Sequence, residues 1–285
     1  MSRSYRDVLY EGIDRLRKSG AEEPEADARV LFDNAFRIDP ARYLLTEHEP
    51  APQEGTLRFK AYLWQRESGR SVQQILSRQD FMGLSFIVSE DVLVPRMDTE
   101  ILVDTILHRL PASGEVQGLD LCTGSGCIAV TLMALARCRL MMDAADLSPR
   151  ALSIARRNGD LLLPGTKPVW LQGDFFEAVP AGKVYDFIVC NPPYIPSGEI
   201  AGLEPQVRDH EPRIALDGGS DGLYFYRRLA EECPDHLTSG SPLYLEIGAE
   251  QGRSVSTILQ SKGFTGIQVI KDLSGLDRVV TAVCP

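Results

Sequence analysis

The chain has 285 residues, of which 44% are hydrophobic and 25% charged, and a formal net charge of −10. These values are ordinary for a globular protein of one or two domains. No apolar run approaches the ~18 residues that a membrane helix requires, so we expect no membrane partner. DNA and RNA binders need clustered Lys and Arg for phosphate contacts, and neither half of this acidic chain offers a basic stretch. We therefore expect no nucleic-acid partner.

The cysteines are too scattered for a metal site. They are Cys122, Cys127, Cys138, Cys190, Cys233 and Cys284. No C-x-x-C pair and no histidine at ligand spacing accompany them, so we expect no metal. The amphipathic N-terminus lacks the apolar core of a signal peptide. Together with cysteines interpreted as reduced thiols, this predicts a cytoplasmic protein, which we also expect to be a monomer.

Helical patterns fill the first domain, which we predict to span residues 1–78. Apolar residues recur there at helical spacing in three stripes. The stripes are Val8, Leu9, Ile13 and Leu16, then Ala28, Leu31, Phe32, Ala35 and Phe36, and finally Leu57, Ala61 and Trp64. We predict that all three stripes face a core. Residues 79–95 alternate apolar and polar positions around Gly83, as a linking β-hairpin would.

Strands and helices alternate in the last domain, residues 96–285. We predict strands at 116–122, 138–145, 167–171, 184–190, 242–247, 265–270 and 278–284. The clearest predicted helices lie at 98–110, 126–136, 149–158, 222–233 and 249–262. Such alternation indicates an α/β fold with a mostly parallel, doubly wound sheet. Ligands of such sheets bind at the carboxyl ends of the strands, near the point where the strand order reverses.

The first strand of this domain runs into a glycine-containing turn, "DLCTGSGCIA". Asp120 closes the strand, Gly124 and Gly126 shape the turn, and a helix follows at once. Small residues let a ligand approach the backbone, and the helix N-terminus presents free N–H groups. The spacing differs from the dinucleotide fingerprint G-x-G-x-x-G and is typical of class I S-adenosylmethionine-dependent methyltransferases. A plain strand-to-helix turn is the alternative.

Acidic residues follow the next two strands. Asp146 can accept hydrogen bonds from both ribose hydroxyls of a nucleoside, and helix capping is its alternative role. Asp174 can bind the adenine amino group, and Phe175 can cover the ring, although a buried Phe needs no ligand.

The fourth strand ends in "NPPYIP", which opens with Asn191-Pro192-Pro193-Tyr194. Each proline fixes its own φ, forces the preceding residue to be extended and lacks an N–H, so the loop is rigid with exposed carbonyls. Such a loop suits a planar –NH2 group: the Asn191 side-chain oxygen and the Pro192 carbonyl each accept one hydrogen. Tyr194 can pack on the flat substrate. Gripping both hydrogens aims a poorly nucleophilic amide nitrogen at an electrophilic methyl group.

With these motifs in this order, the chain resembles the bacterial release-factor glutamine methyltransferases, the PrmC/HemK family. The resemblance covers nearly the whole chain, including "VLVPRMDTEILV", "DLCTGSGCIA", "GDFFEAV", "NPPYIP", "VRDHEPRIALDGGSDGLYFYRRL", "LYLEIGAEQG" and "IKDLSGLDRVV". It implies a class I methyltransferase, Rossmann-like fold with a small N-terminal helical domain that recognises the substrate. It also implies methyl transfer from S-adenosyl-L-methionine, leaving S-adenosyl-L-homocysteine. The acceptor would be the side-chain amide nitrogen (N5) of the glutamine in the Gly-Gly-Gln motif of peptide chain release factors.

The motifs and the resemblance together assign the site residues. Cofactor contacts are expected from Asp120, Cys122, Thr123, Gly124, Ser125, Gly126, Asp146, Leu147, Asp174, Phe175 and Asn191. Catalytic contacts to the substrate amide are expected from Asn191, Pro192, Pro193 and Tyr194, and further substrate contacts from Arg96, Thr99 and Glu100.

The chain departs from the family pattern in three places, one of them a dipeptide. Cys122 stands where a Gly is usual, Met97-Asp98 replaces Pro-Glu, and Phe175 replaces a frequent Trp. We expect Cys122 to tighten the cofactor turn without abolishing it and to have no nucleophilic role, because direct methyl transfer needs no covalent enzyme intermediate. The role of Asp98 is left open.

Two alternative functions stay open. A glutamine methyltransferase of ribosomal protein L3 carries the same tetrapeptide, although "NPPYIP" and "LDGGSDGL" favour the release factor. An adenine-N6 DNA methyltransferase uses a similar loop, but it would need a basic groove for the flipped base and usually a target-recognition domain.

Overall fold

The computed structural model describes residues 3–285 and divides them into two compact units. The first unit combines the residues up to Arg78 with the separate stretch Glu204–His210. The second unit consists of Gln79–Leu203 and Glu211–Pro285.

The first unit is helical. Its helices are α1 (Tyr5–Ser19), α2 (Pro24–Phe36), α3 (Pro40–Thr46), α4 (Gln53–Glu67), α5 (Val72–Leu76) and α9 (Pro205–Arg208). Serine side chains define two of the helix starts: Ser4 forms a capping box with Asp7 at α1, and Ser71 forms one with Gln74 at α5. Each box satisfies main-chain N–H groups that a helix start otherwise leaves without a partner.

The buried face of α4 differs from the predicted one. The predicted stripe is Leu57, Ala61 and Trp64. It is wrong, because all three side chains are exposed, Trp64 to 68%. Phe59 and Leu63 enter the core instead, with no more than 2% of either exposed. A Cβ at Gly12 of α1 would lie 2.4 Å from the Phe59 ring, so the missing side chain of Gly12 lets Phe59 pack against α1.

The stretch Glu204–His210 is anchored to the N-terminal helices. The Gln74 side-chain amide donates a hydrogen bond of 2.6 Å to the main-chain oxygen of His210. The His210 ring nitrogen Nε2 lies 3.0 Å from the main-chain oxygen of Ser68. No periodic pattern in the sequence predicts this association, because it joins residues more than 130 positions apart.

A hairpin of β1 (Arg78–Phe81) and β2 (Leu84–Ile87) lies where the sequence predicts one, but it ends at Ile87 and is shorter than the predicted range of 79–95. Met82 and Gly83 connect the strands with φ values of 49° and 76°, the left-handed geometry that a two-residue hairpin turn requires. The Met82 N–H donates to the Glu100 carboxylate at 2.6 Å. Glu100 therefore holds the hairpin turn, and it does not line the cavity described below.

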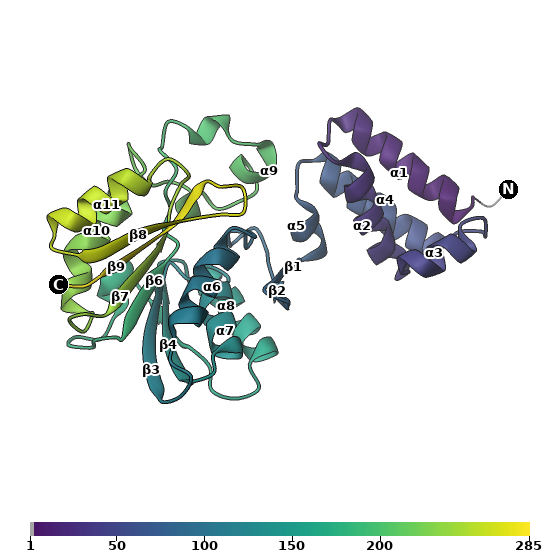
Figure 1. Ribbon diagram of the computed structural model, residues 1–285. Helices are drawn as coiled ribbons and strands as arrows, with labels where there is room; N and C mark the ends of the chain where they lie inside the picture. The colour runs from purple at the N-terminus through teal and green to yellow at the C-terminus, as the bar shows by residue number, and fades with distance from the viewer. Residues whose placement is uncertain (1–2) are drawn as a thin grey trace. The chain divides into compact units, whose positions relative to one another are not determined.

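A seven-stranded sheet forms the centre of the second unit (Figure 1). Its strands are β3 (Glu115–Leu121), β4 (Arg139–Asp146), β5 (Val169–Gln172), β6 (Phe187–Cys190), β7 (Pro242–Glu246), β8 (Thr265–Lys271) and β9 (Asp277–Val283). They lie in the order β5-β4-β3-β6-β7-β9-β8; the contacts from β5 to β7 are parallel, and β9 is antiparallel to both of its neighbours. The chain moves outward from β3 to β5 and then returns to β6, so the strand order reverses between β3 and β6. The predicted α/β, doubly wound fold is confirmed.

Helices cover both faces of the sheet. The remaining elements are α6 (Thr99–Arg109), α7 (Cys127–Leu135), α8 (Pro149–Leu162), α10 (Tyr224–Glu232), α11 (Gly252–Ser261) and the short 3-10 helices η1 (Phe175–Ala178), η2 (Ile200–Gly202), η3 (Arg213–Ala215) and η4 (Cys233–Asp235). In Figure 1, α6, α7 and α8 lie on one side of the strands, and α10 and α11 lie on the other. Alternate residues of β6 serve the two layers: Ile188 and Cys190 pack in the core that contains α10 and α11, and Val189 packs in the core that contains α6 and α7. β6 is buried on both faces, as central parallel strands are.

Three further findings concern residues 3–285 as a whole. Every cysteine is a free thiol. No group of three or more His, Cys, Asp or Glu side chains in this range could hold a metal ion. None of the helices in it combines the length and apolar character that a membrane crossing demands.

Candidate active site

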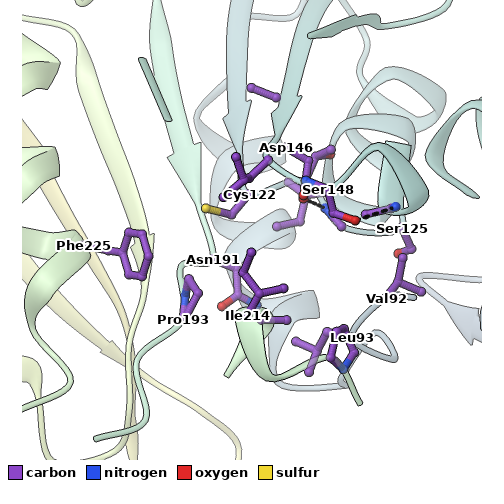
Figure 2. Close-up of a pocket in the computed structure, with 18 of the residues that line it drawn as sticks. Val92, Leu93, Cys122, Ser125, Asp146, Ser148, Asn191, Pro193, Ile214 and Phe225 are labelled. Carbon is purple, nitrogen blue, oxygen red and sulfur yellow. Dashed lines mark hydrogen bonds between the residues drawn. The ribbon is translucent and has the colours of Figure 1, made fainter. Parts of the chain in front are cut away.

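A cavity of about 280 Å³ lies at the carboxyl ends of β3, β4 and β6, where the strand order reverses. All of its lining residues belong to the second unit. They include Val92, Leu93, Arg96, Thr99, Cys122, Thr123, Gly124, Ser125, Asp146, Leu147, Asp174, Phe175, Asn191, Pro193, Ile214, Phe225 and Arg228. In Figure 2, Cys122 and Asn191 lie between Asp146 and Ser148 on one side and Pro193 and Phe225 on the other. The topology thus brings residues from seven separate segments of the second unit to one place.

The turn after β3 exposes its backbone to this cavity. The Thr123 N–H donates to Ala145 of β4 at 3.0 Å, and the Gly126 N–H donates to Thr123 at 2.8 Å. Cys122, Gly124 and Gly126 have φ values of 59°, 56° and 79°. Such left-handed geometry strains a residue with a Cβ, so Cys122 adopts a conformation that a glycine would adopt more readily. Gly126 is the N-cap of α7, while Cys122 to Ser125 line the cavity.

Asp120 lies beneath this turn and does not line the cavity. One oxygen accepts from the Thr123 hydroxyl at 2.6 Å and from the Ala129 N–H at 3.2 Å. The other oxygen has no hydrogen-bond partner within the described residues. Because the side chain is fully buried, its pKa is raised to about 7. The structure therefore places Asp120 as a support of the turn.

Asp146 is fixed by the main chain at the end of β4. Its Oδ2 accepts from the Gly124 N–H and its Oδ1 from the Ser148 N–H, both at 2.8 Å. Burial raises the pKa of Asp146, and these two hydrogen bonds oppose that shift. A carboxylate has about four acceptor sites, so each oxygen keeps capacity for a hydroxyl donor from the cavity. Ser148 itself caps α8 by accepting from Ala151 at 3.2 Å.

Asp174 and Phe175 meet Arg228 at the next wall. Arg228 donates to Asp174 at 2.9 Å and to Glu232 at 2.8 Å, and its guanidinium lies 4.8 Å from the centroid of the Phe175 ring. Phe175 is 5% exposed and also contacts Phe225, with ring centroids 5.5 Å apart. This wall offers aromatic surface together with a carboxylate that is partly occupied by Arg228.

The loop after β6 presents two of its four residues to the cavity. Asn191 and Pro193 line it, whereas Pro192 and Tyr194 do not. The Tyr194 main-chain oxygen accepts from the Gln251 side chain at 2.9 Å. A Cβ at Gly222 would lie 2.4 Å from that oxygen, so the glycine-rich motif at 217–222 packs directly against the tetrapeptide. The tetrapeptide and this motif therefore pack as one unit.

The segment that begins α6 closes another side. Arg96 donates to both carboxylate oxygens of Glu211 at 2.8 Å. Thr99 is 2% exposed, and its hydroxyl oxygen lies 3.4 Å from the Asn191 side-chain nitrogen. Asp98, whose role the sequence left open, forms an ion pair of 3.1 Å with Arg278 of β9.

The cavity suits a ligand without phosphates. The cationic lining residues within the described part of the chain are Arg96 and Arg228, and each is already paired with carboxylates. Phosphate recognition requires cations or a nest of N–H groups free to bind it. Asp146 and Asp174 instead favour a ligand with hydroxyl, amino or cationic groups.

Comparison with known proteins agrees with this geometry. Residues 7–76 match the family described as PrmC N-terminal domain, and residues 96–202 match the family described as Methyltransferase small domain. A release factor glutamine methyltransferase from Cereibacter sphaeroides is 42% identical over 98% of this chain and 98% of its own. One from Moorella thermoacetica is 38% identical over 97% of both chains. The chain belongs to the release factor glutamine methyltransferase family.

Solved structures add a likeness of fold. A 16S rRNA methyltransferase of T. thermophilus, determined in complex with AdoMet and guanosine, aligns with a TM-score of 0.52 over 73% of this chain and 50% of its own. At 16% identity this relation shows the fold alone. The predicted family membership and methyltransferase fold are thus confirmed.

Sequence reasoning missed part of the cavity wall. Leu93, Ile214 and Phe225 line it, although no motif marks them as ligand contacts. Phe225 lies within "GLYFYRRL" and Ile214 within "EPRIALDGG", so the family motifs that contain them were the available indication.

Proposed function

We propose that this chain transfers a methyl group from S-adenosyl-L-methionine to the side-chain amide nitrogen of the glutamine in the Gly-Gly-Gln motif of release factors. One observation carries the proposal: in a member of this family, Asn191 of the Asn-Pro-Pro-Tyr loop faces the same cavity as the fixed Asp146 carboxylate. Since methyl transfer needs its two reactants in line, donor and acceptor must meet in such a shared cavity.

The cavity residues fit the cofactor. Asp146 would accept hydrogen bonds from the ribose hydroxyls, and the backbone of residues 122–126 would lie against the amino-acid portion. Phe175 and Phe225 supply aromatic surface for the adenine, and Asp174 an acceptor for its amino group. S-adenosylmethionine supplies, when bound, an electrophilic methyl group on a positively charged sulfur. The negative charge of Asp146 and Asp174 is compatible with that cation.

Asn191 and Pro192 would grip the substrate amide. The Asn191 side-chain oxygen, which lines the cavity, would accept one hydrogen. The carbonyl of Pro192, the residue between the two lining residues Asn191 and Pro193, would accept the other, and together they would hold the nitrogen toward the methyl group. Proline has no N–H to compete for these oxygens, and Gln251 and Gly222 hold the end of the loop in place. Because the grip strengthens as the nitrogen becomes positive, it stabilises the transition state more than the ground state.

No general base is needed before attack. The amide attacks as the neutral group, and its proton becomes strongly acidic after methylation. Burial raises the pKa of Tyr194 to about 12, so its phenol stays protonated at neutral pH. A phenol that stays protonated does not act as a base, which is consistent with a packing role for the Tyr194 ring.

We assign recognition of the release factor to the N-terminal helical region, residues 1–78. Its surface exposes large apolar side chains, including Leu45 at 85% and Leu44 at 71%. These two neighbouring leucines offer a partner protein apolar surface to bury. The free thiols support a cytoplasmic location, where thiols stay reduced, and we propose that the enzyme acts there as a monomer.

Labelled methyl transfer tests the proposal. Purified enzyme and cofactor with a labelled methyl group are incubated with release factor, with ribosomal protein L3 and with unmethylated DNA. We expect label in the release factor alone, and none when its Gly-Gly-Gln glutamine is replaced by alanine. Equal labelling of the alanine variant, or preferential labelling of either other substrate, would overturn the assignment.

A further inference from the structure

The motif "LYLEIGAEQG" places a buried carboxyl beside the catalytic loop. β6 and β7 are parallel, with Ile188 opposite Leu243 and Cys190 opposite Leu245. Asn191 directly follows Cys190, and Glu246 follows Leu245 as the last residue of β7, so the register brings these two residues to the same end of the sheet. Glu246 is 2% exposed and does not line the cavity.

The surroundings of Glu246 form a short chain of polar groups. The Asn191 side-chain nitrogen lies 3.4 Å from the Thr99 hydroxyl oxygen. The Thr99 hydroxyl and the Asn191 amide both stabilise the ionised Glu246 carboxyl. Its Oε2 has no direct hydrogen-bond partner in the described structure, so the carboxylate keeps acceptor capacity in a buried place. Such capacity is costly unless a donor uses it.

An asparagine side chain carries an acceptor and a donor that a rotation of 180° exchanges. The proposed amide grip needs the Asn191 oxygen toward the substrate, since a substrate –NH2 group offers only donors. The nitrogen must then face the opposite way, and Thr99 and Glu246 are the acceptors there. With Glu246 ionised, the reversed orientation would place the Asn191 oxygen against a carboxylate, which is unfavourable.

Building on the proposed function, we infer that Glu246 is a positioning residue: acting with Thr99, its carboxylate holds the Asn191 amide nitrogen and so turns the Asn191 oxygen toward the substrate glutamine. Glu246 touches neither substrate nor cofactor. It acts through Asn191, and it determines how much of the enzyme is competent at a given moment.

The protonation of Glu246 makes this role measurable. Burial raises the pKa of Glu246 to about 7, and Thr99, Arg278 and Asn191 oppose the shift. The charged or titratable groups around it are Arg278, Asp98, Tyr194, Tyr226 and Cys127. The pKa of Tyr194 and that of Cys127 are each raised to about 12, and burial raises that of Tyr226 well above its ordinary value. These three groups stay neutral while Glu246 ionises.

A first experiment observes Asn191 without any substrate. The side-chain NH2 signals of Asn191 in the cofactor-bound enzyme are assigned by nuclear magnetic resonance from their absence in Asn191→Ala. We expect these proton signals to move downfield as the pH rises through about 7, and to stop titrating in Glu246→Gln. The titration should persist in Asp120→Asn, which removes the other buried carboxyl whose pKa is about 7. Loss of the titration in Asp120→Asn rather than Glu246→Gln, or its absence in the wild type, would overturn the inference.

A second experiment measures turnover with release factor. At pH 8 we expect Glu246→Gln to lower kcat about tenfold or more, the scale of a misplaced catalytic group, with cofactor Kd changed less than about threefold. Thr99→Val should act similarly, and Thr99→Ser, which keeps the hydroxyl, should restore most of the rate. Normal kcat in both Glu246→Gln and Thr99→Val would refute the positioning role. If Glu246→Gln fails to fold, the turnover of Thr99→Val and Thr99→Ser and the titration of the Asn191 signals in the wild type still test the positioning role. If wild-type enzyme fails to methylate release factor, the proposed function falls, while the resonance experiment still decides the role of Glu246.

Discussion

Replacing Asp146 tests the cofactor site most directly. The carboxylate is held by two main-chain hydrogen bonds of 2.8 Å and is partly exposed to the cavity. Asp146→Ala would remove the proposed bonds to the ribose hydroxyls. A hydrogen bond to a charged group contributes about 1.5–3 kcal/mol, and water can replace part of it in an open cavity. We therefore expect a loss of about 1–3 kcal/mol in binding, which is about a 5- to 150-fold rise in Kd.

Titration calorimetry with S-adenosyl-L-homocysteine measures this effect without turnover. The Kd of Asp146→Asn should lie between the Kd of the wild type and that of Asp146→Ala. One side-chain oxygen remains in this variant, but the new NH2 group faces a main-chain N–H donor. Asp160→Asn is the matched control: Asp160 lies on α8, exposed, and pairs with Lys167 away from the cavity. A Kd for Asp146→Ala within twofold of wild type would refute the ribose-binding role.

Four further changes have defined outcomes. Asn191→Ala should lower kcat by roughly 100-fold or more, while the cofactor Kd stays within a few fold of the wild-type value. Asn191→Asp should retain more activity than Asn191→Ala because it keeps a hydrogen-bond acceptor. Normal turnover in Asn191→Ala would contradict the amide grip. Cys122→Gly should keep activity within a few fold and raise the Tm, since glycine tolerates the φ of 59°; complete loss of turnover in the folded variant would point to a chemical role for the thiol. The ordinary pKa of Asp120 is 3.8, and burial raises it to about 7 in the folded protein, so the folded state binds more protons between these values and loses stability as the pH rises. The Tm of Asp120→Asn should therefore fall less between pH 4 and pH 7 than the Tm of the wild type. An equal fall of Tm in both proteins would argue against this titration. Deleting residues 1–75 should leave cofactor binding intact but sharply lower methylation of intact release factor, and full-rate methylation by the truncated enzyme would remove the recognition role.

Local chemistry made the sheet and its loops predictable. Short β-rich runs bounded by turns coincide with β3, β4 and β7 to within one or two residues. The turn around Gly124 and the loop at Asn191 could be placed at one sheet edge because parallel strands end on the same side. This reasoning needs only the order of the elements.

The sequence alone could not predict which side chains become buried where tertiary packing decides between alternatives. Both faces of α4 carry apolar residues, and the choice of Phe59 over Trp64 depends on the space at Gly12 of another helix. Asp120 ends a strand in the way expected of a ligand contact, yet its side chain turns beneath the loop toward Thr123. Ile214 reaches the cavity from the 3-10 helix η3, which is too short to show a sequence period.

The discontinuity of the first unit affects how this enzyme can be rearranged. Because Glu204–His210 belongs to that unit, the unit consists of two separate segments of the chain, and the Gln74–His210 hydrogen bond joins them. A chimera that exchanges only the first 78 residues would therefore keep a foreign seven-residue insertion opposite the new helices. With the recognition role that we propose for the first unit, exchanging substrate recognition between relatives requires that both stretches be transferred together, despite the 125 residues that separate them.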